Sequence, residues 1–135
     1  MNNEQVAIAF AKGDKECHSG TMRHNGEYLF SYSTPVAKRV GKTFLITDIN
    51  YSSTTQRHIQ HVMSACNDYI IVEDINGTKE YNTKAMLDTI KYLKGKAKRA
   101  RCYTDAYLRW IDRCRKNLRK YRRLYERVNN SKESE

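Results

Sequence analysis

The chain has 135 residues, 39% of them hydrophobic, and 25 Lys and Arg against 15 Asp and Glu give it a net charge of +10. This length predicts one domain with an appendage, and the regular recurrence of Tyr, Ile, Val and Leu argues against a disordered chain. No run approaches the roughly 20 apolar residues of a membrane span. The first residues lack the basic-then-apolar order of a signal peptide, so we expect a cytoplasmic protein without a membrane partner.

The first predicted element is a short helix over residues 3–12. Asn2 or Asn3 can accept hydrogen bonds from the first free amides, and Gly13 can adopt the left-handed conformation that ends a helix. Residues 13–19 are expected to form a loop.

Two hairpins are predicted after this loop, because the apolar residues change to a period of two. Asn25 and Gly26 suit a two-residue turn, since both tolerate positive φ. Pro35 is expected to end the strand that follows this turn. The predicted strands are residues 21–23, 27–33, 36–40 and 43–47.

A second helix is predicted to begin at a capping box formed by Ser53 and Gln56 and to end near Cys66. Its expected buried face consists of Ile59, Val62, Met63 and Cys66. A last strand over residues 68–75 closes in an Asn-Gly turn. Residues 1–78 are therefore predicted to form a small α+β domain, a mostly antiparallel sheet with one or two packed helices.

Strand signals stop after Gly77, and small and apolar residues then recur at intervals of four and three without a slip. They are Met86, Ile90, Leu93, Ala97, Ala100, Thr104, Tyr107, Ile111, Cys114, Leu118, Tyr121, Tyr125 and Val128. This heptad seam predicts a helical region over residues 79–128. Its first helix is expected to begin near Lys84, with Asn82 or Thr83 as its cap. Residues 129–135 are expected to form a flexible tail.

The seam allows more than one arrangement. One is a single helix of about 40 residues, on the order of 60 Å long. Another is a helical hairpin that folds back at residues 95–100, where Gly95 costs about 1 kcal/mol relative to Ala inside a helix. We favour the hairpin, because a long soluble helix needs a partner along its length. A homodimer joined by the seam would supply such a partner as well.

The basic residues of this region are the strongest functional signal. Residues 94–127 hold fourteen Lys and Arg against three acids, a charge of 14 − 3 = +11. Such a surface favours a polyanion, either nucleic acid or a nucleoprotein, over a solvated face or a contact with an acidic protein. The predicted binding residues are Lys94, Lys96, Lys98, Arg99, Arg101, Arg109, Arg113, Arg115, Lys116, Arg119, Lys120, Arg122, Arg123 and Arg127. We expect the apolar residues that flank the seam to widen its buried face: Tyr103, Leu108, Trp110 and Leu124.

No sequence pattern indicates an enzyme, a cofactor or a metal site. Phosphate-cradling glycine motifs, nucleophile elbows and C-x-x-C pairs are missing from the sequence, and we expect a non-enzymatic protein with free cysteines. A less favoured alternative is a metal-dependent nuclease, in which carboxylates at a sheet edge hold Mg²⁺ beside a lysine. Its residues would be Asp48, Glu73, Asp74 and Lys79.

Two further groups of side chains have the chemistry of binding residues. Tyr28, Phe30 and Tyr32 alternate along one predicted strand, so they either form core or present a face on which bases stack. His58 and His61 are spaced three apart on the second helix, and we expect both to be surface residues.

The first half of the chain resembles a group of small proteins encoded mainly by bacteriophages and other mobile elements. The resemblance rests on three stretches and the short helix before them: Ser19 to Arg23, Tyr28 to Ala37, and Tyr51 to His58. It implies a fold and carries over no catalytic residues, and the basic region after residue 80 departs from it. It also implies a phage setting inside a bacterial host. Small phage proteins of this size often bind DNA or disable host defence complexes such as CRISPR nucleases.

Overall fold

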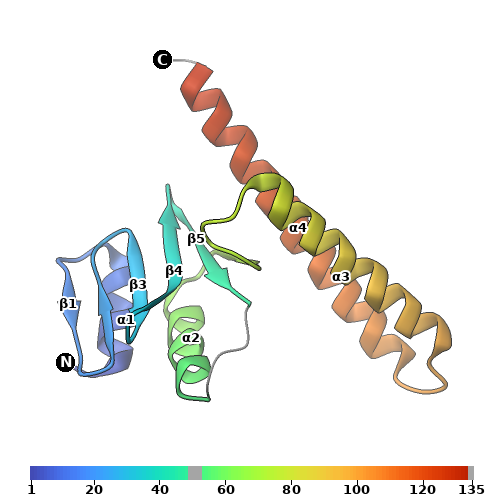
Figure 1. The fold of residues 1–135 in the computed structure, drawn as a ribbon, viewed down its shortest axis with the longest axis horizontal. Coiled ribbons are helices and arrows are strands. Elements are labelled where there is room, and N and C mark those ends of the chain that lie inside the picture. The colour runs from blue at the N-terminus through green and yellow to red at the C-terminus, as the bar shows by residue number, and fades with distance from the viewer. Residues whose placement is uncertain (49–52, 134–135) are drawn as a thin grey trace. The chain divides into compact units, whose positions relative to one another are not determined.

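The computed structural model describes residues 1–48 and 53–133, and within the last helix it describes side chains as far as Glu126. The chain divides into two compact units, Met1–Asn76 and Gly77–Glu135 (Figure 1). The first unit holds a sheet with two helices, and the second is a pair of long helices. This architecture confirms the predicted α+β class and the helical region that follows it.

The sheet of the first unit has six strands in sequence order. Neighbouring strands are antiparallel except for β5 and β6, which run parallel because helix α2 connects them. The predicted sheet, mostly antiparallel, is therefore confirmed. Its strands are β1 (Cys17–His18), β2 (Met22–His24), β3 (Tyr28–Ser31), β4 (Thr34–Val40), β5 (Thr43–Thr47) and β6 (Tyr69–Val72).

Helix α1 (Asn3–Lys12) begins and ends as predicted. The Asn2 side chain accepts a hydrogen bond from the amide of Gln5, whose own side chain accepts one from the Asn2 amide. Gly13 ends the helix at a φ of 74°. These contacts satisfy amides and carbonyls that the ends of any helix leave free.

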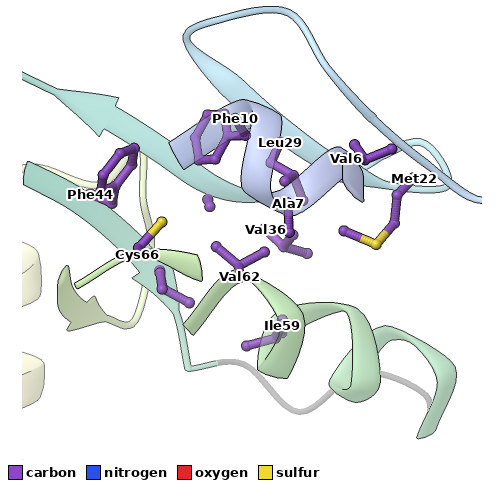
Figure 2. Packing of buried hydrophobic residues seen from close by; sticks show 12 residues of the cluster. Val6, Ala7, Phe10, Met22, Leu29, Val36, Phe44, Ile59, Val62 and Cys66 are labelled. Atoms are coloured by element: carbon purple, nitrogen blue, oxygen red, sulfur yellow. The ribbon is translucent and has the colours of Figure 1, made fainter. Parts of the chain in front are cut away.

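Helices α1 and α2 (Ser53–Ala65) pack on the sheet through one apolar cluster (Figure 2). Phe10 from α1 lies against Phe44 of β5, with ring centroids 5.3 Å apart. Cys66, directly after α2, is buried in this cluster, and burial raises the pKa of its thiol to about 11. The predicted buried face of α2 is confirmed for Ile59, Val62 and Cys66, and Met63 is half-buried.

Three local predictions in the first unit were wrong or incomplete. The loop at residues 13–19 contains the two-residue strand β1. Pro35 does not end a strand but lies near the start of β4, where it pairs with Phe30 beside an irregularity in the register. The preceding strand ends earlier than predicted, at a turn in which Tyr32 has a φ of 57°. Helix α2 begins at Ser53, the predicted cap residue, and the residue before it lies outside the described residues.

The second unit consists of α3 (Lys79–Arg99) and α4 (Thr104–Glu133), which pack side by side as an antiparallel hairpin (Figure 1). Helix α3 begins five residues before the predicted start at Lys84, because the Thr78 hydroxyl accepts a hydrogen bond from the Tyr81 amide and caps it. Helix α4 continues to Glu133, beyond the end of the predicted seam.

The hairpin turns later than the glycine suggests. Gly95 is helical within α3, and the chain leaves the helix at Ala100, whose backbone is extended, and re-enters after Tyr103 at a φ of 64°. The seam closes within one chain: its buried members are Met86, Ile90 and Leu93 of α3 and Ile111, Leu118 and Tyr121 of α4. A homodimer of the chain stays a prediction. Within the part of the chain that the structure describes, neither of these helices nor the shorter ones have an apolar stretch of membrane-spanning length.

Candidate nucleic-acid interface

The basic residues lie on the outside of the hairpin because the seam points the apolar residues inward. Twelve of the fourteen predicted binding residues have exposed side chains, and Lys96 is half-buried. The side chain of Arg127 lies outside the described part of the chain. The structure thus brings the charges of residues 94–126 onto one hairpin of two packed helices.

Acidic side chains neutralise little of this charge. Lys116 pairs with Asp112 through an Nζ–Oδ2 distance of 3.0 Å, and both side chains are well exposed. Asp105 and Glu126 are the other acids in residues 94–127, so cations outnumber acids by eleven in this segment. Neighbours three or four positions apart on a helix therefore repel one another, which favours binding of an anionic partner.

A buried polar contact fixes the register of the two helices. The Asn82 side-chain amide donates to the Tyr121 hydroxyl at 3.1 Å, and that hydroxyl donates to Tyr125 at 3.4 Å. Neither Asn82 nor Tyr121 is exposed, and burial raises the pKa of the Tyr121 hydroxyl. Lys79 at the start of α3 lies over the Tyr125 ring. The start of α3 is thereby held against residues 121–125 of α4.

The flanks of the seam differ from the prediction. Leu124 is buried, as expected, but Tyr103, Leu108 and Trp110 are all at least half exposed. In a two-helix hairpin only the facing stripes are covered, so residues beside the seam stay in contact with water. A shallow hollow on α4 includes Leu108 among charged neighbours, lined by Asp105, Leu108, Arg109, Asp112 and Arg113.

The aromatic residues of β3 are arranged differently from the prediction. Tyr28 and Phe30 share the outer side of β3 and are half-buried, each beside a cation: Lys38 for Tyr28 and Arg23 for Phe30. Tyr32 lies in the turn instead, exposed, with its ring 5.8 Å from that of His58. The three rings therefore do not form one continuous face.

His58 is buried, so its prediction as a surface residue was wrong. Its Nδ1 lies 2.6 Å from the Ser31 hydroxyl and its Nε2 lies 3.2 Å from the Asn3 amide nitrogen. Because Asn3 Oδ1 accepts from the hydroxyls of Ser19 and Thr21, its NH₂ group faces Nε2, which places the imidazole proton on Nδ1. The pKa of His58 is lowered mainly by burial, with His61 acting in the same direction.

This network joins side chains that are far apart in the sequence, so periodicity could not reveal it. The sequence signal for this network is a polar residue at a position on an otherwise apolar face, such as Ser31 on the inner side of β3. Ser31 and His58 have the chemistry of a nucleophile and a base, but both are at most 2% exposed. The network therefore joins α1, α2 and the sheet rather than offering a surface to a substrate.

The carboxylates of the alternative nuclease site are only partly brought together. Burial and the nearby Glu73 carboxylate raise the pKa of Asp48. Asp74 accepts a hydrogen bond from the Asn76 amide in the turn after β6. Among the described residues there is no group of three or more His, Cys, Asp or Glu side chains placed to hold a metal ion.

The fold and this surface define a small α+β domain that carries a strongly basic helical hairpin. The chain belongs to a family of unknown function, DUF8033, whose model matches residues 3–85. The match covers the first unit and the first two turns of α3, so the charged part of the hairpin lies outside it. No curated protein and no solved structure matches the chain.

Proposed function

We propose that the protein is a non-enzymatic nucleic-acid-binding protein whose α3–α4 hairpin contacts the phosphate backbone, either of free nucleic acid or within a nucleoprotein. The observation that carries this proposal is the charge of +11 on residues 94–127, carried by side chains that are almost all exposed. Phosphates neutralise such a surface and release the counterions condensed on the nucleic acid.

The dimensions of the hairpin suit this role. Helix α3, with 21 residues, is about 30 Å long at 1.5 Å per residue. That length corresponds to roughly nine base pairs of duplex at 3.4 Å per pair. Arg outnumbers Lys on α4, and the guanidinium group suits forked contacts to phosphate oxygens. Binding of this kind depends on charge and spacing and not on base sequence.

The test is a salt series with matched charge variants. A labelled duplex of 20 base pairs is titrated with the protein at several NaCl concentrations, and log K is plotted against log salt. The Arg115→Gln, Arg119→Gln, Arg122→Gln triple variant should lower the slope by up to about 3 units, because each lost phosphate contact removes about 0.9.

The control removes the same number of charges from the first unit. Lys12→Gln, Lys15→Gln and Lys42→Gln replace three exposed lysines there and should leave the slope unchanged. Circular dichroism of both triple variants checks that the helices remain. The proposal is wrong if the two triple variants behave alike, or if the unaltered protein binds no nucleic acid at low salt.

A further inference from the structure

Three aromatic side chains near the turn of the hairpin are exposed, although such rings are usually mostly buried. Tyr92 is 61% exposed, Tyr103 is 78% exposed and Trp110 is 50% exposed. Each ring leaves a large apolar area in water. Packing within the hairpin does not account for their presence at these positions.

The register of the hairpin places these rings at similar positions along its long axis. Asn82 faces Tyr121, so Tyr92, ten residues further along α3, lies level with residue 111, next to Trp110. Lys96, fourteen residues beyond Asn82, lies level with residue 107, between Trp110 and Tyr103.

Lys96 and Trp110 also lie on the same side of the seam. Each directly precedes a seam residue of the same heptad position, and Tyr103 is the residue before helix α4, one heptad ahead of Trp110. In an antiparallel pair such positions flank the seam on one side. The Lys96 Nζ lies 5.5 Å from the centroid of the Tyr92 ring, which joins Tyr92 to this group. We call Tyr92, Lys96, Tyr103 and Trp110 the tip surface.

The tip surface overlaps a run of cations at the end of α3 and in the turn after it. Residues 91–101 hold six Lys and Arg and no acid. Rings between cations are the combination with which proteins bind single strands, since the cations hold phosphates while bases stack on the rings.

The backbone at Tyr103 adds an independent observation. Its φ of 64° is left-handed, a conformation that costs a residue with a side chain about 1 kcal/mol or more. Gly or Asn would make this turn with less strain. The turn itself therefore does not require a tyrosine, whose ring is the most exposed of the three.

We propose that the tip surface stacks unpaired bases, so that the hairpin prefers single-stranded nucleic acid over duplex. This inference rests on the proposed function and names the form of nucleic acid. Bases of a duplex are already stacked on one another, and only splayed or unpaired bases can reach the rings. The opposite flank of the seam carries Leu87, Lys94 and Leu108. It offers a cation but no aromatic ring, so only one side of the hairpin can stack bases.

Trp110 is the only tryptophan of the chain, so its fluorescence reports stacking directly. The protein is titrated with a 12-nucleotide oligothymidylate, with a duplex of equal length, and with heparin, a polyanion without bases. Quenching by the single strand but not by heparin at matched occupancy, with weaker binding of the duplex, supports the proposal. Equal affinity for single strand and duplex without quenching overturns it and leaves the proposed function standing.

Variants separate stacking from charge. Trp110→Gln, Tyr92→Gln and Tyr103→Asn should each weaken binding of the labelled oligonucleotide about fivefold or more, and leave heparin binding within about twofold. The control is Leu108→Gln on the opposite flank, at a residue that is 52% exposed, close to the 50% of Trp110. An equal loss in this control overturns the proposal. If neither heparin nor any nucleic acid binds at low salt, the proposed function is wrong as well.

Discussion

At the scale of single residues, His58 shows how a titratable group becomes part of a fold. The Ser31 hydroxyl and the Asn3 amide hold opposite sides of one neutral imidazole. A protonated imidazole would have hydrogen on both nitrogens, so Nε2 would then face another donor. The hydrogen bonds and the burial that lowers the pKa of His58 therefore favour the same neutral state.

We predict that the protein becomes less stable as the pH falls below the ordinary histidine pKa of 6.5. The unfolded chain then binds a proton at His58 that the folded chain does not bind. The free energy of unfolding therefore decreases as the pH decreases. His24, whose pKa is lowered mainly by burial and also by Arg39, acts in the same direction. The measurement is the melting temperature between pH 7.5 and 5.5, followed by circular dichroism.

The control for this prediction is a pair of histidine variants. His58→Gln cannot titrate and should reduce the loss of stability with falling pH, whatever its melting temperature at pH 7.5. His18→Gln makes the same substitution at an exposed histidine and is the comparison, in which the loss of stability with falling pH should be reduced less than in His58→Gln. A melting temperature that does not change between pH 7.5 and 5.5 would contradict the assigned neutral state.

At the scale of elements, Gly95 shows that a residue of low helix propensity does not have to mark the position of a turn. It lies inside α3, and a Cβ there would meet the Arg99 guanidinium at 3.5 Å, an ordinary contact with a flexible side chain. Glycine inside a helix costs about 0.5–1 kcal/mol relative to alanine. The hairpin therefore forms despite Gly95 and not because of it.

We predict that Gly95→Ala raises the free energy of unfolding by about 0.5–1 kcal/mol. Gly26→Ala makes the contrasting change, because Gly26 has a φ of +93°, a conformation that strains alanine even though the space around it is open. It should lower the free energy of unfolding. Urea denaturation of both variants measures the two effects, and destabilisation by Gly95→Ala would show that the close packing of α3 requires glycine.

The elements that the sequence predicts well are those set by local contacts. The cap of α1, the hairpin turn that contains Gly26, and the buried faces of α2 and the seam all follow from neighbouring residues, although Asn25 does not take the positive φ expected of it. The start of α3 was mistaken because Asn82 has the chemistry of a cap, but it is used in a contact with Tyr121, 39 residues away. Tertiary packing decides whether such a side chain caps a helix or contacts a distant residue, and a local sequence pattern carries no information about that packing.

The candidate interface was predictable in its charge and not in its aromatic residues. Fourteen cations between the positions of one seam must lie outside it, whatever the helices pack against. Whether Trp110 is covered depends on what lies beside the seam, and in a hairpin of two helices half of its surface stays in contact with water. The heptad period thus indicated the stripe that packs but not how wide that stripe is.

At the scale of the whole molecule, the charge is divided unevenly. Residues 94–127 carry +11 and the rest of the chain carries 10 − 11 = −1. The hairpin is therefore compact in spite of repulsion among its own side chains. Salt acts on this repulsion and on nucleic-acid binding in opposite directions, because it screens like charges and also competes for phosphates.

We predict that NaCl stabilises the free hairpin while it weakens its binding. Between about 20 and 500 mM NaCl the screening length falls from roughly 20 Å to 4 Å, below the spacing of neighbouring side chains on a helix. Relief of repulsion on the order of 1 kcal/mol should raise the melting temperature by several degrees, followed through the fluorescence of Trp110 in the hairpin.

The Arg115→Gln, Arg119→Gln, Arg122→Gln variant has less repulsion to screen, so it should melt higher at low salt and respond less to NaCl. A melting temperature that stays level or falls with salt would mean that the basic side chains are neutralised within the folded chain, and the same result would remove the charge that the proposed function needs.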